Sequence, residues 1–118
     1  MKFYVASKAK HGAMWQKYKS QGVHITSRWI DKWDQGTFPA DYQNQHWAEI
    51  LEDIHACDAL VLYHKEGEVQ KGALAEWGIA YGLGKQLFYV GSDNVPFTGL
   101  MCQFVEKCNS LEEVFGVE

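Results

Sequence analysis

ALVLY at residues 59–63, followed after a short charged segment by KGALAEWGIAYGLGK at residues 71–85, is the stretch that decides the fold of this chain. The first part is a continuous apolar run, which predicts a buried strand. The second part is long, free of proline and rich in alanine and leucine, which predicts a helix. A buried strand followed by a helix is the repeating unit of a parallel α/β sheet.

The rest of the chain continues this alternation. Strands are predicted at residues 2–7, 23–27, 58–64 and 86–91, with a short fifth strand as an option at 104–108; helices are predicted at 12–20, 41–56 and 71–85, and after a capping box at Ser110. We therefore predict one domain over residues 1–118, a small three-layer, doubly wound α/β sandwich. Its parallel sheet has four or five strands in the order 2-1-3-4, with any fifth strand last.

One carboxylate, Glu76, is predicted to lie in the first turn of the 71–85 helix, at the carboxyl end of the preceding strand. Ligands of open α/β sheets bind in the crevice at that end. The positive end of the helix dipole should keep Glu76 ionised at neutral pH, as nucleophilic attack on a sugar carbon requires. The alternative is that Glu76 only complements the dipole. Glycines and alanines around it, among them Gly72, indicate close approach of a ligand or of the sheet.

The segment from Cys57 to Ala80, with Gly84, Lys85 and the apolar run after them, resembles the nucleoside 2-deoxyribosyltransferase superfamily. Residues 3–7 are similar to the first strand and substrate loop of that family, so the resemblance covers most of the chain. It implies that Glu76 is the nucleophile that attacks the anomeric carbon of a nucleoside or nucleotide.

A second acid is also expected, because the departing base needs a proton. In the resembled family an aspartate on the preceding helix often positions the nucleophile or the substrate. The local pattern departs from the family here, and Glu49 is the preferred candidate on approximate alignment, with Glu52 and Asp53 as alternatives. Each of the three would otherwise be a solvated helix charge.

Polar and aromatic residues after the first two strands are candidates for substrate binding. The pattern formed by Lys8, His11 and Trp15 is similar to a Lys-x-x-His-x-x-x-Trp pattern of a compact subgroup of the family. Ser7, Lys8 and His11 would bind a sugar hydroxyl or a 5′-phosphate, and Trp29 would stack on a base. Core packing is the better interpretation of Trp15. The predicted substrate-binding residues are Tyr4, Ser7, Lys8, His11, Trp29 and Gly72.

Composition excludes several functional classes. The net charge of −4 argues against binding of a nucleic-acid polymer, and no apolar run reaches the length of a membrane span. The first segment lacks the features of a signal peptide, so we expect a cytoplasmic protein. Cys57, Cys102 and Cys108 form no CxxC pair and are expected to be reduced and structural. The histidine spacing matches no metal motif, and we predict neither a metal nor another cofactor.

Two functions remain open on the sequence. The first is an enzyme that cleaves or transfers the N-glycosidic bond of a nucleoside or nucleoside monophosphate through Glu76, and we favour it. The second is a binding module that senses or sequesters a nucleotide-derived small molecule. We also predict a homodimer, because the chain is small and carries more aromatic surface than its core readily covers. The aromatic residues concerned are Trp29, Trp33, Phe38 and Trp47.

Overall fold

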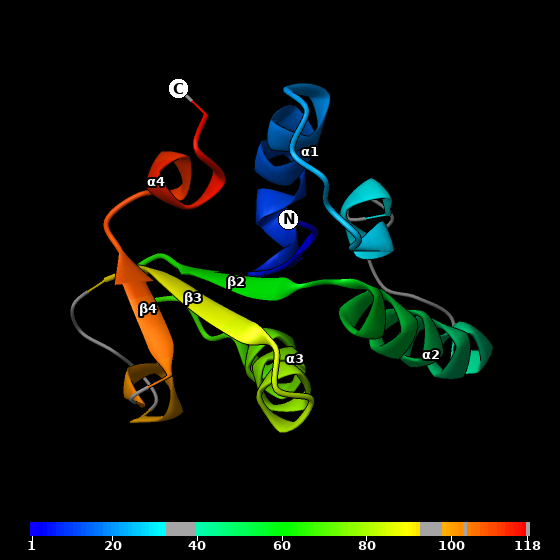
Figure 1. Ribbon diagram of the computed structural model, residues 1–118. Coiled ribbons are helices and arrows are strands. Elements are labelled where there is room, and N and C mark those ends of the chain that lie inside the picture. The colour runs from blue at the N-terminus through cyan, green and yellow to red at the C-terminus, as the bar shows by residue number, and fades with distance from the viewer. Residues whose placement is uncertain (33–39, 93–97, 103, 118) are drawn as a thin grey trace.

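Four parallel strands form the sheet in the computed structural model, which describes residues 1–32, 40–92, 98–102 and 104–117. The strands lie side by side in chain order: β1 (Phe3–Ala6), β2 (Ala59–His64), β3 (Gln86–Gly91) and β4 (Val105–Cys108). Ala59 of β2 lies opposite Phe3 of β1 and Gln86 of β3. Because all pairs are parallel, every strand ends at the same edge of the sheet (Figure 1).

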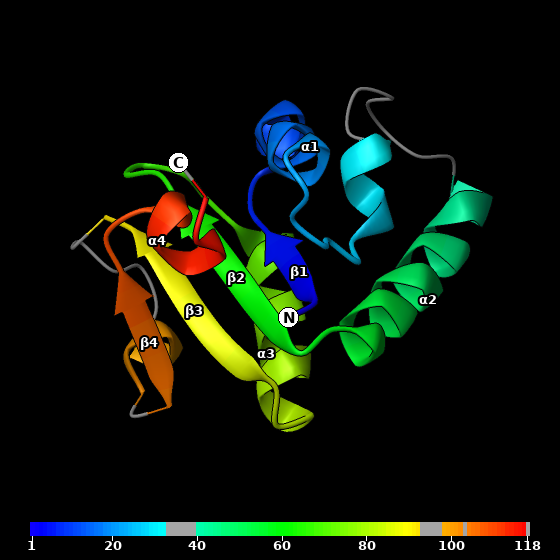
Figure 2. The same ribbon diagram turned by 45° about the horizontal axis from the view of Figure 1, so that its top comes forward.

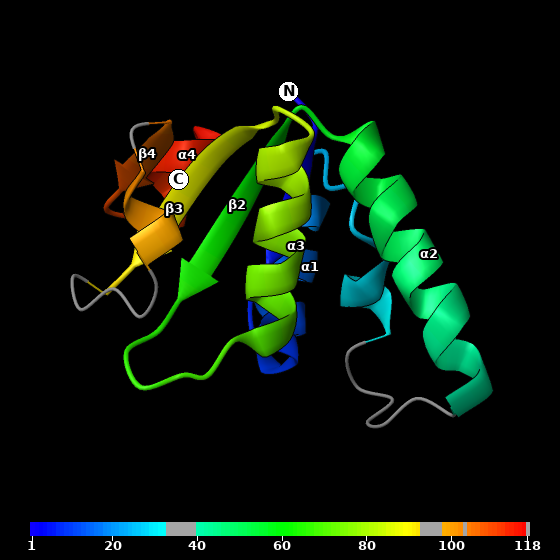
Figure 3. The same ribbon diagram turned by 90° about the horizontal axis from the view of Figure 1, so that it is seen from below.

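Helices cover both faces of this sheet. One face carries α1 (Gly12–Ser20) and α4 (Leu111–Phe115), which come forward in Figure 2. The other face carries α2 (Ala40–Ala56) and α3 (Lys71–Gly82), which are nearest the viewer in Figure 3. Three short 3-10 turns complete the described elements: η1 (Ala9–His11), η2 (Arg28–Asp31) and η4 (Thr98–Met101). The predicted α/β class with a parallel sheet is confirmed, and its layering is compatible with a doubly wound sandwich.

Alternate residues of each strand supply the two cores. In β1, Tyr4 packs toward α2 and α3, where Trp77 is also buried. Its neighbour Val5 packs on the opposite face, where Trp15 of α1 is fully buried. A strand covered on both faces needs apolar side chains at every position, which explains the continuous apolar run of β2.

The segment 23–27, predicted as a strand, forms one isolated parallel bridge between Ile25 and Phe3. This bridge lies on the side of β1 that does not pair with β2. The predicted strand order, which needs a full strand at this edge, is therefore not confirmed. The optional strand near residue 104 is present as β4.

Side chains end the pairing after this bridge. The Val5 amide donates a hydrogen bond to the Ser27 hydroxyl at 2.8 Å, and the Trp29 indole nitrogen donates to the Val5 carbonyl at 2.9 Å. Asp53 of α2 then accepts hydrogen bonds from the backbone and side-chain nitrogens of Arg28, both at 2.9 Å. These contacts turn the chain into η2 instead of extending a strand.

The spacing of Trp47, Ile50, Leu51 and Ile54 by three and four residues predicts a single inward face for the helix over 41–56, and α2 matches this prediction only in part. Ile50 and Ile54 are buried as predicted, but Trp47 and Leu51 are exposed, with Trp47 at 43%. The helix lies at the β1 side of the sheet (Figure 2), so a narrower stripe than predicted contacts the core. Trp47 is thereby left at the edge of the cleft described next.

Candidate active site

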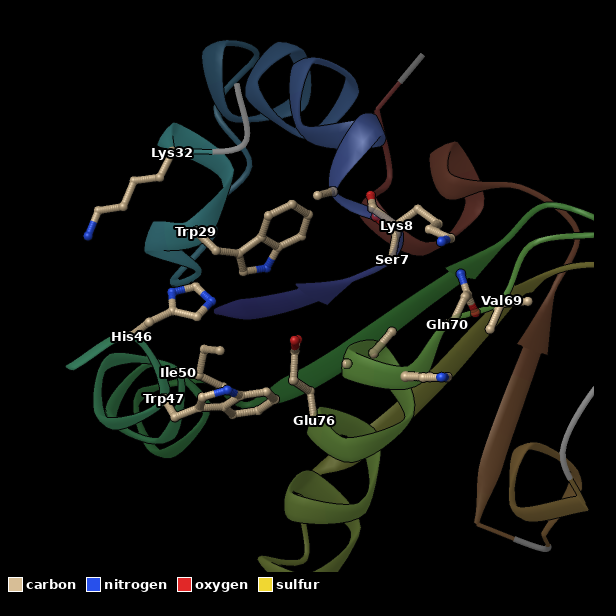
Figure 4. A pocket seen from close by; sticks show the side chains of 14 residues that line it. Ser7, Lys8, Trp29, Lys32, His46, Trp47, Ile50, Val69, Gln70 and Glu76 are labelled. Carbon is tan, nitrogen blue, oxygen red and sulfur yellow. The ribbon is translucent and has the colours of Figure 1, made fainter. Parts of the chain in front are cut away.

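A cleft of about 540 Å³ opens at the carboxyl end of β1, between the start of α3, the η2 turn and α2 (Figure 4). This is the edge where ligands bind in open α/β sheets, and the sequence predicts a crevice there. The residues that line the cleft are Ser7, Lys8, Ala9, Trp29, Lys32, His46, Trp47, Ile50, Val69, Gln70, Lys71, Gly72, Ala73 and Glu76.

Glu76 points from α3 into the middle of the cleft (Figure 4), and only 9% of its surface is exposed. Because α3 begins at Lys71, Glu76 lies in the second turn, and the prediction of a first-turn position is wrong. The helix dipole acts mainly within the first turn, so burial dominates the electrostatics. Burial raises the pKa of Glu76 to about 8. In the free protein the carboxyl is therefore largely protonated at pH 7, contrary to the predicted ionised state.

Three buried side-chain oxygens, one of them in this carboxyl, have no hydrogen-bond partner in the described structure. The Tyr4 hydroxyl lowers the pKa of Glu76. Burial first, and then Glu76, raise the pKa of Tyr4 well above its usual value. The two groups do not reach hydrogen-bond geometry, since the Tyr4 hydroxyl and Oε2 of Glu76 are both without a partner in the described structure, as is Oε1 of Gln70. Such atoms are rare in native proteins, and the two that belong to residues lining the cleft, in Glu76 and Gln70, favour a site that receives polar groups of a ligand.

The cleft has two chemically different ends, with Glu76 between them (Figure 4). The aromatic end is formed by Trp29, His46 and Trp47. The polar end is formed by Ser7, Lys8 and Gln70, with Val69 beside them. Lys71, which follows Gln70 and opens α3, also lines the cleft. A ligand that fills the cleft would therefore place a flat apolar part at one end and a polar or anionic part at the other.

Tryptophan hydrogen bonds position the walls of the cleft. The buried Trp15 indole donates to the Ser7 hydroxyl at 2.8 Å, and Ser7 in turn donates to the Lys8 carbonyl at 2.9 Å. The Lys8 side chain remains exposed at the polar end. The interpretation of Trp15 as a core residue is confirmed, and of the predicted binding residues, Ser7, Lys8, Trp29 and Gly72 line the cleft. Tyr4 is instead fully buried in the core and does not line the cleft.

His11 does not line the cleft. Its Nε2 lies 2.7 Å from Oε2 of Glu68, which also forms an ion pair with Lys10 at 3.3 Å. The second oxygen of Glu68 accepts a hydrogen bond from the Lys65 amide at 2.9 Å. His11 therefore connects the loop after β1 to the loop before α3, and this placement does not support the prediction that it binds a phosphate.

The predicted second acid also lies outside the lining. Glu49 accepts a hydrogen bond from Lys32 at 2.9 Å, and this contact lowers the pKa of Glu49, so the carboxylate stays ionised. Of the alternatives, Asp53 is held by Arg28, and the exposed Glu52 pairs with the same guanidinium at 2.8 Å. This arrangement does not support a proton-donor role for Glu49, because an ionised, paired carboxylate has no proton to give.

The sequence interpretation missed several residues of the cleft, chiefly Lys32, His46, Trp47 and Gln70. Two signals were available. His46 lies one turn before Ile50 on α2 and therefore on the same face of the helix. Where this face extends beyond the sheet, His46 lines the adjoining space. Lys71 opens a helix, where a positive charge opposes the dipole, and that unfavourable position indicates a functional role.

Within the described ranges, no group of three or more His, Cys, Asp or Glu side chains is arranged to hold a metal ion. The three cysteines are free, as predicted. Over the same residues, no helix has the length and apolar character needed to cross a membrane. No protein-family model matches the chain, and no curated protein sequence matches it significantly.

Proposed function

We propose that this protein cleaves or transfers the N-glycosidic bond of a nucleoside or nucleoside monophosphate, with Glu76 as the nucleophile. The observation that carries the proposal is a buried carboxyl with an unpartnered oxygen at the centre of a cleft, between an aromatic end and a polar end. The resemblance to the nucleoside 2-deoxyribosyltransferase superfamily points to the same residue. The bridge between Phe3 and Ile25 lies where a second strand of the implied 2-1-3-4 order would lie, which supports the same relationship.

The chemistry follows from the surroundings of Glu76. Cleavage builds positive charge on the sugar, and a carboxylate beneath the anomeric carbon stabilises that charge and traps the sugar covalently. A sugar hydroxyl that donates to the unpartnered oxygen favours the ionised form, so substrate binding lowers the raised pKa of Glu76. The carboxylate is thus generated when the substrate is present.

The two ends of the cleft suit the two ends of such a substrate. The base stacks at the aromatic end, where Trp29 and Trp47 offer flat faces. A 5′-phosphate would lie at the polar end, where Lys8 and Lys71 supply positive charge. The first amide groups of α3 add to this end, because no side chain caps the helix at Gln70.

Incubation with a panel of deoxynucleosides, ribonucleosides and their 5′-monophosphates, followed by detection of free base, tests the proposal. Glu76→Gln should lower turnover by more than about 10³-fold, since it keeps the shape of the side chain and removes the nucleophile. The matched control is Glu66→Gln, which changes an exposed glutamate that does not line the cleft. An unchanged rate in a folded Glu76→Gln variant would overturn the assignment.

One observation favours the alternative of a binding module. Glu76 is the only carboxylate among the described residues that line the cleft, and it is largely protonated in the free protein. A binding module would bind members of the same panel without releasing base, and Glu76→Gln would retain most of that affinity. Titration calorimetry alongside the base-release assay separates the two functions.

We further propose that the protein is a homodimer. Trp47 is exposed and Trp29 is only partly buried at one end of the cleft, and in so small a domain a second copy would supply the missing wall of the cleft beside them. Trp33 and Phe38, the other aromatics behind this expectation, lie outside the described residues. Light scattering at micromolar concentrations should give twice the mass of the chain, and a monomeric mass would contradict the proposal.

A further inference from the structure

The proposed reaction needs a proton for the departing base, and the cleft limits where that proton comes from. Glu76 is engaged with the sugar. Glu49 lies outside the lining and is held by Lys32, while Asp53 is held by Arg28. The second acid is therefore to be sought among the other residues that line the aromatic end.

His46 lies at that end. It is half-buried on α2, and in Figure 4 its ring lies between those of Trp29 and Trp47, to the left of Glu76. Its ring centroid is 6.2 Å from that of Trp47, with the planes at 70°. Among the described lining residues it is the only histidine, the side chain that ordinarily exchanges a proton between pH 5 and 8.

We propose that His46 is the acid that protonates the leaving base, an inference that rests on the proposed function. As the C1′–N bond breaks, its electron pair passes to the base nitrogen, which takes the proton from the imidazolium ring. An oxygen of Glu76 forms the new bond to C1′. In the second half-reaction the neutral imidazole accepts a proton from water, or from the N–H of an incoming base, as the sugar leaves Glu76.

The charges around His46 suit this role. Burial and the ammonium group of Lys32 lower the pKa of His46, while Glu49 raises it, and the net shift is downward. A protonated His46 is therefore a stronger acid than an ordinary imidazolium. The active form needs His46 protonated and Glu76 ionised, so kcat/KM should be highest between the two pKa values and fall on both sides.

A substrate whose base leaves without taking up a proton tests whether His46 acts in protonation of the leaving base. An N7-methylated purine nucleoside already carries its positive charge, so its base departs without an acid. His46→Gln should lower kcat for the unmethylated nucleoside by about 10²-fold or more and change kcat for the methylated one by less than about threefold. His55→Gln, an exposed histidine on the same helix and outside the cleft, is the matched control.

Each outcome decides the question. Equal losses on both substrates would mean that His46 only shapes the cleft, and no loss on either would mean that it takes no part; both overturn the inference. Wild-type protein that releases base from no nucleoside overturns the proposed function itself. If His46→Gln does not fold, or if only pyrimidine nucleosides are cleaved, His46→Ala provides the test. Rescue of this variant by added imidazole and loss of the alkaline limb of its pH profile are expected, because that limb reports loss of the His46 proton, and their absence overturns the inference.

Discussion

Glu68 and Glu76 are two enclosed carboxylates, eight positions apart in the chain, in opposite chemical states. The side chain of Glu68 is 6% exposed, and its oxygens meet His11, Lys10 and the Lys65 amide. Burial raises the pKa of Glu68, but the amide and His11 outweigh it, and the net pKa lies below the usual value. Glu76 is buried to a similar extent without such partners, and its pKa rises to about 8.

The difference separates a group that holds the structure from a group that is available to a ligand. The contacts of Glu68 with Lys10 and His11 tie the loop after β1 to the loop before α3, and its contact with the Lys65 amide lies within the latter loop, so its charge is used within the protein. Glu76 retains an oxygen that no described group meets. Burial alone therefore does not identify a functional carboxylate, whereas burial without partners beside a cleft does.

The largest effect on stability is expected at Glu76. Its folded-state pKa is raised from about 4.5 to about 8, so its contribution to stability is fully present below pH 4.5 and is lost as the pH rises through 8. Glu76→Gln removes this loss. The free energies of unfolding of the variant and the wild type should differ little at pH 5. At pH 8.5 the free energy of unfolding of the variant should exceed that of the wild type by on the order of 4 kcal/mol. Urea unfolding at both values measures this, and a pH-independent difference would contradict it.

Glu68→Gln should act in the opposite sense. The pKa of Glu68 is lowered, so the ionised carboxylate contributes stability above its unfolded-state pKa, and that contribution is lost as the pH falls through the folded-state value. Replacing the carboxylate should cost about 1–3 kcal/mol at pH 7 and leave base release nearly unchanged per folded molecule. Urea unfolding and turnover assays on one preparation test both parts. Loss of turnover in a stable Glu68→Gln variant would contradict the conclusion that Glu68 is structural and Glu76 is functional.

The smallest expected effect is on ligand preference and concerns two lysines, one paired with Glu68 and one lining the cleft that contains Glu76. Lys10 pairs with Glu68, whereas Lys8 lines the cleft. Lys8→Ala should reduce the preference for a 5′-monophosphate over the bare nucleoside about tenfold, because it removes one charge-assisted contact, and Lys10→Ala should not. Titration calorimetry with both ligands checks this. Equal losses in the two variants would show that general attraction, not position, sets the preference.

Much of the fold could be predicted because strand and helix periodicity are local properties. The apolar run of β2 and the small-residue helix after it specify the α/β unit before any contact is known. The edge beyond β1 could not be predicted in this way. Residues 23–27 alternate like a strand, but Ser27 and Asp53 replace backbone pairing with side-chain contacts from distant positions.

The residues of the candidate site also differ in whether local sequence patterns or tertiary packing bring them to the cleft. Glu76 and Trp29 were found because the end of a strand and an aromatic face are visible in the sequence. The predicted role of Glu49 is not supported by its pairing with Lys32, and that pairing could not be predicted because Lys32 comes from another element and the contact depends on tertiary packing. The helical spacing places His46 on the same face as Ile50, but its position at the cleft also depends on where α2 packs, which the spacing does not specify.

The hydrogen bonds that Ser27 and Trp29 make to Val5 also block the addition of a strand from another molecule to the free edge of β1. The free side of a strand is a template on which another chain adds, and repeated addition leads to aggregation. Here an incoming strand would find the Val5 amide and carbonyl already occupied. The indole nitrogen of Trp29 thus occupies a backbone acceptor at the edge of the sheet, while its ring forms a wall of the cleft. A substitution at this residue should therefore both promote aggregation and weaken ligand binding.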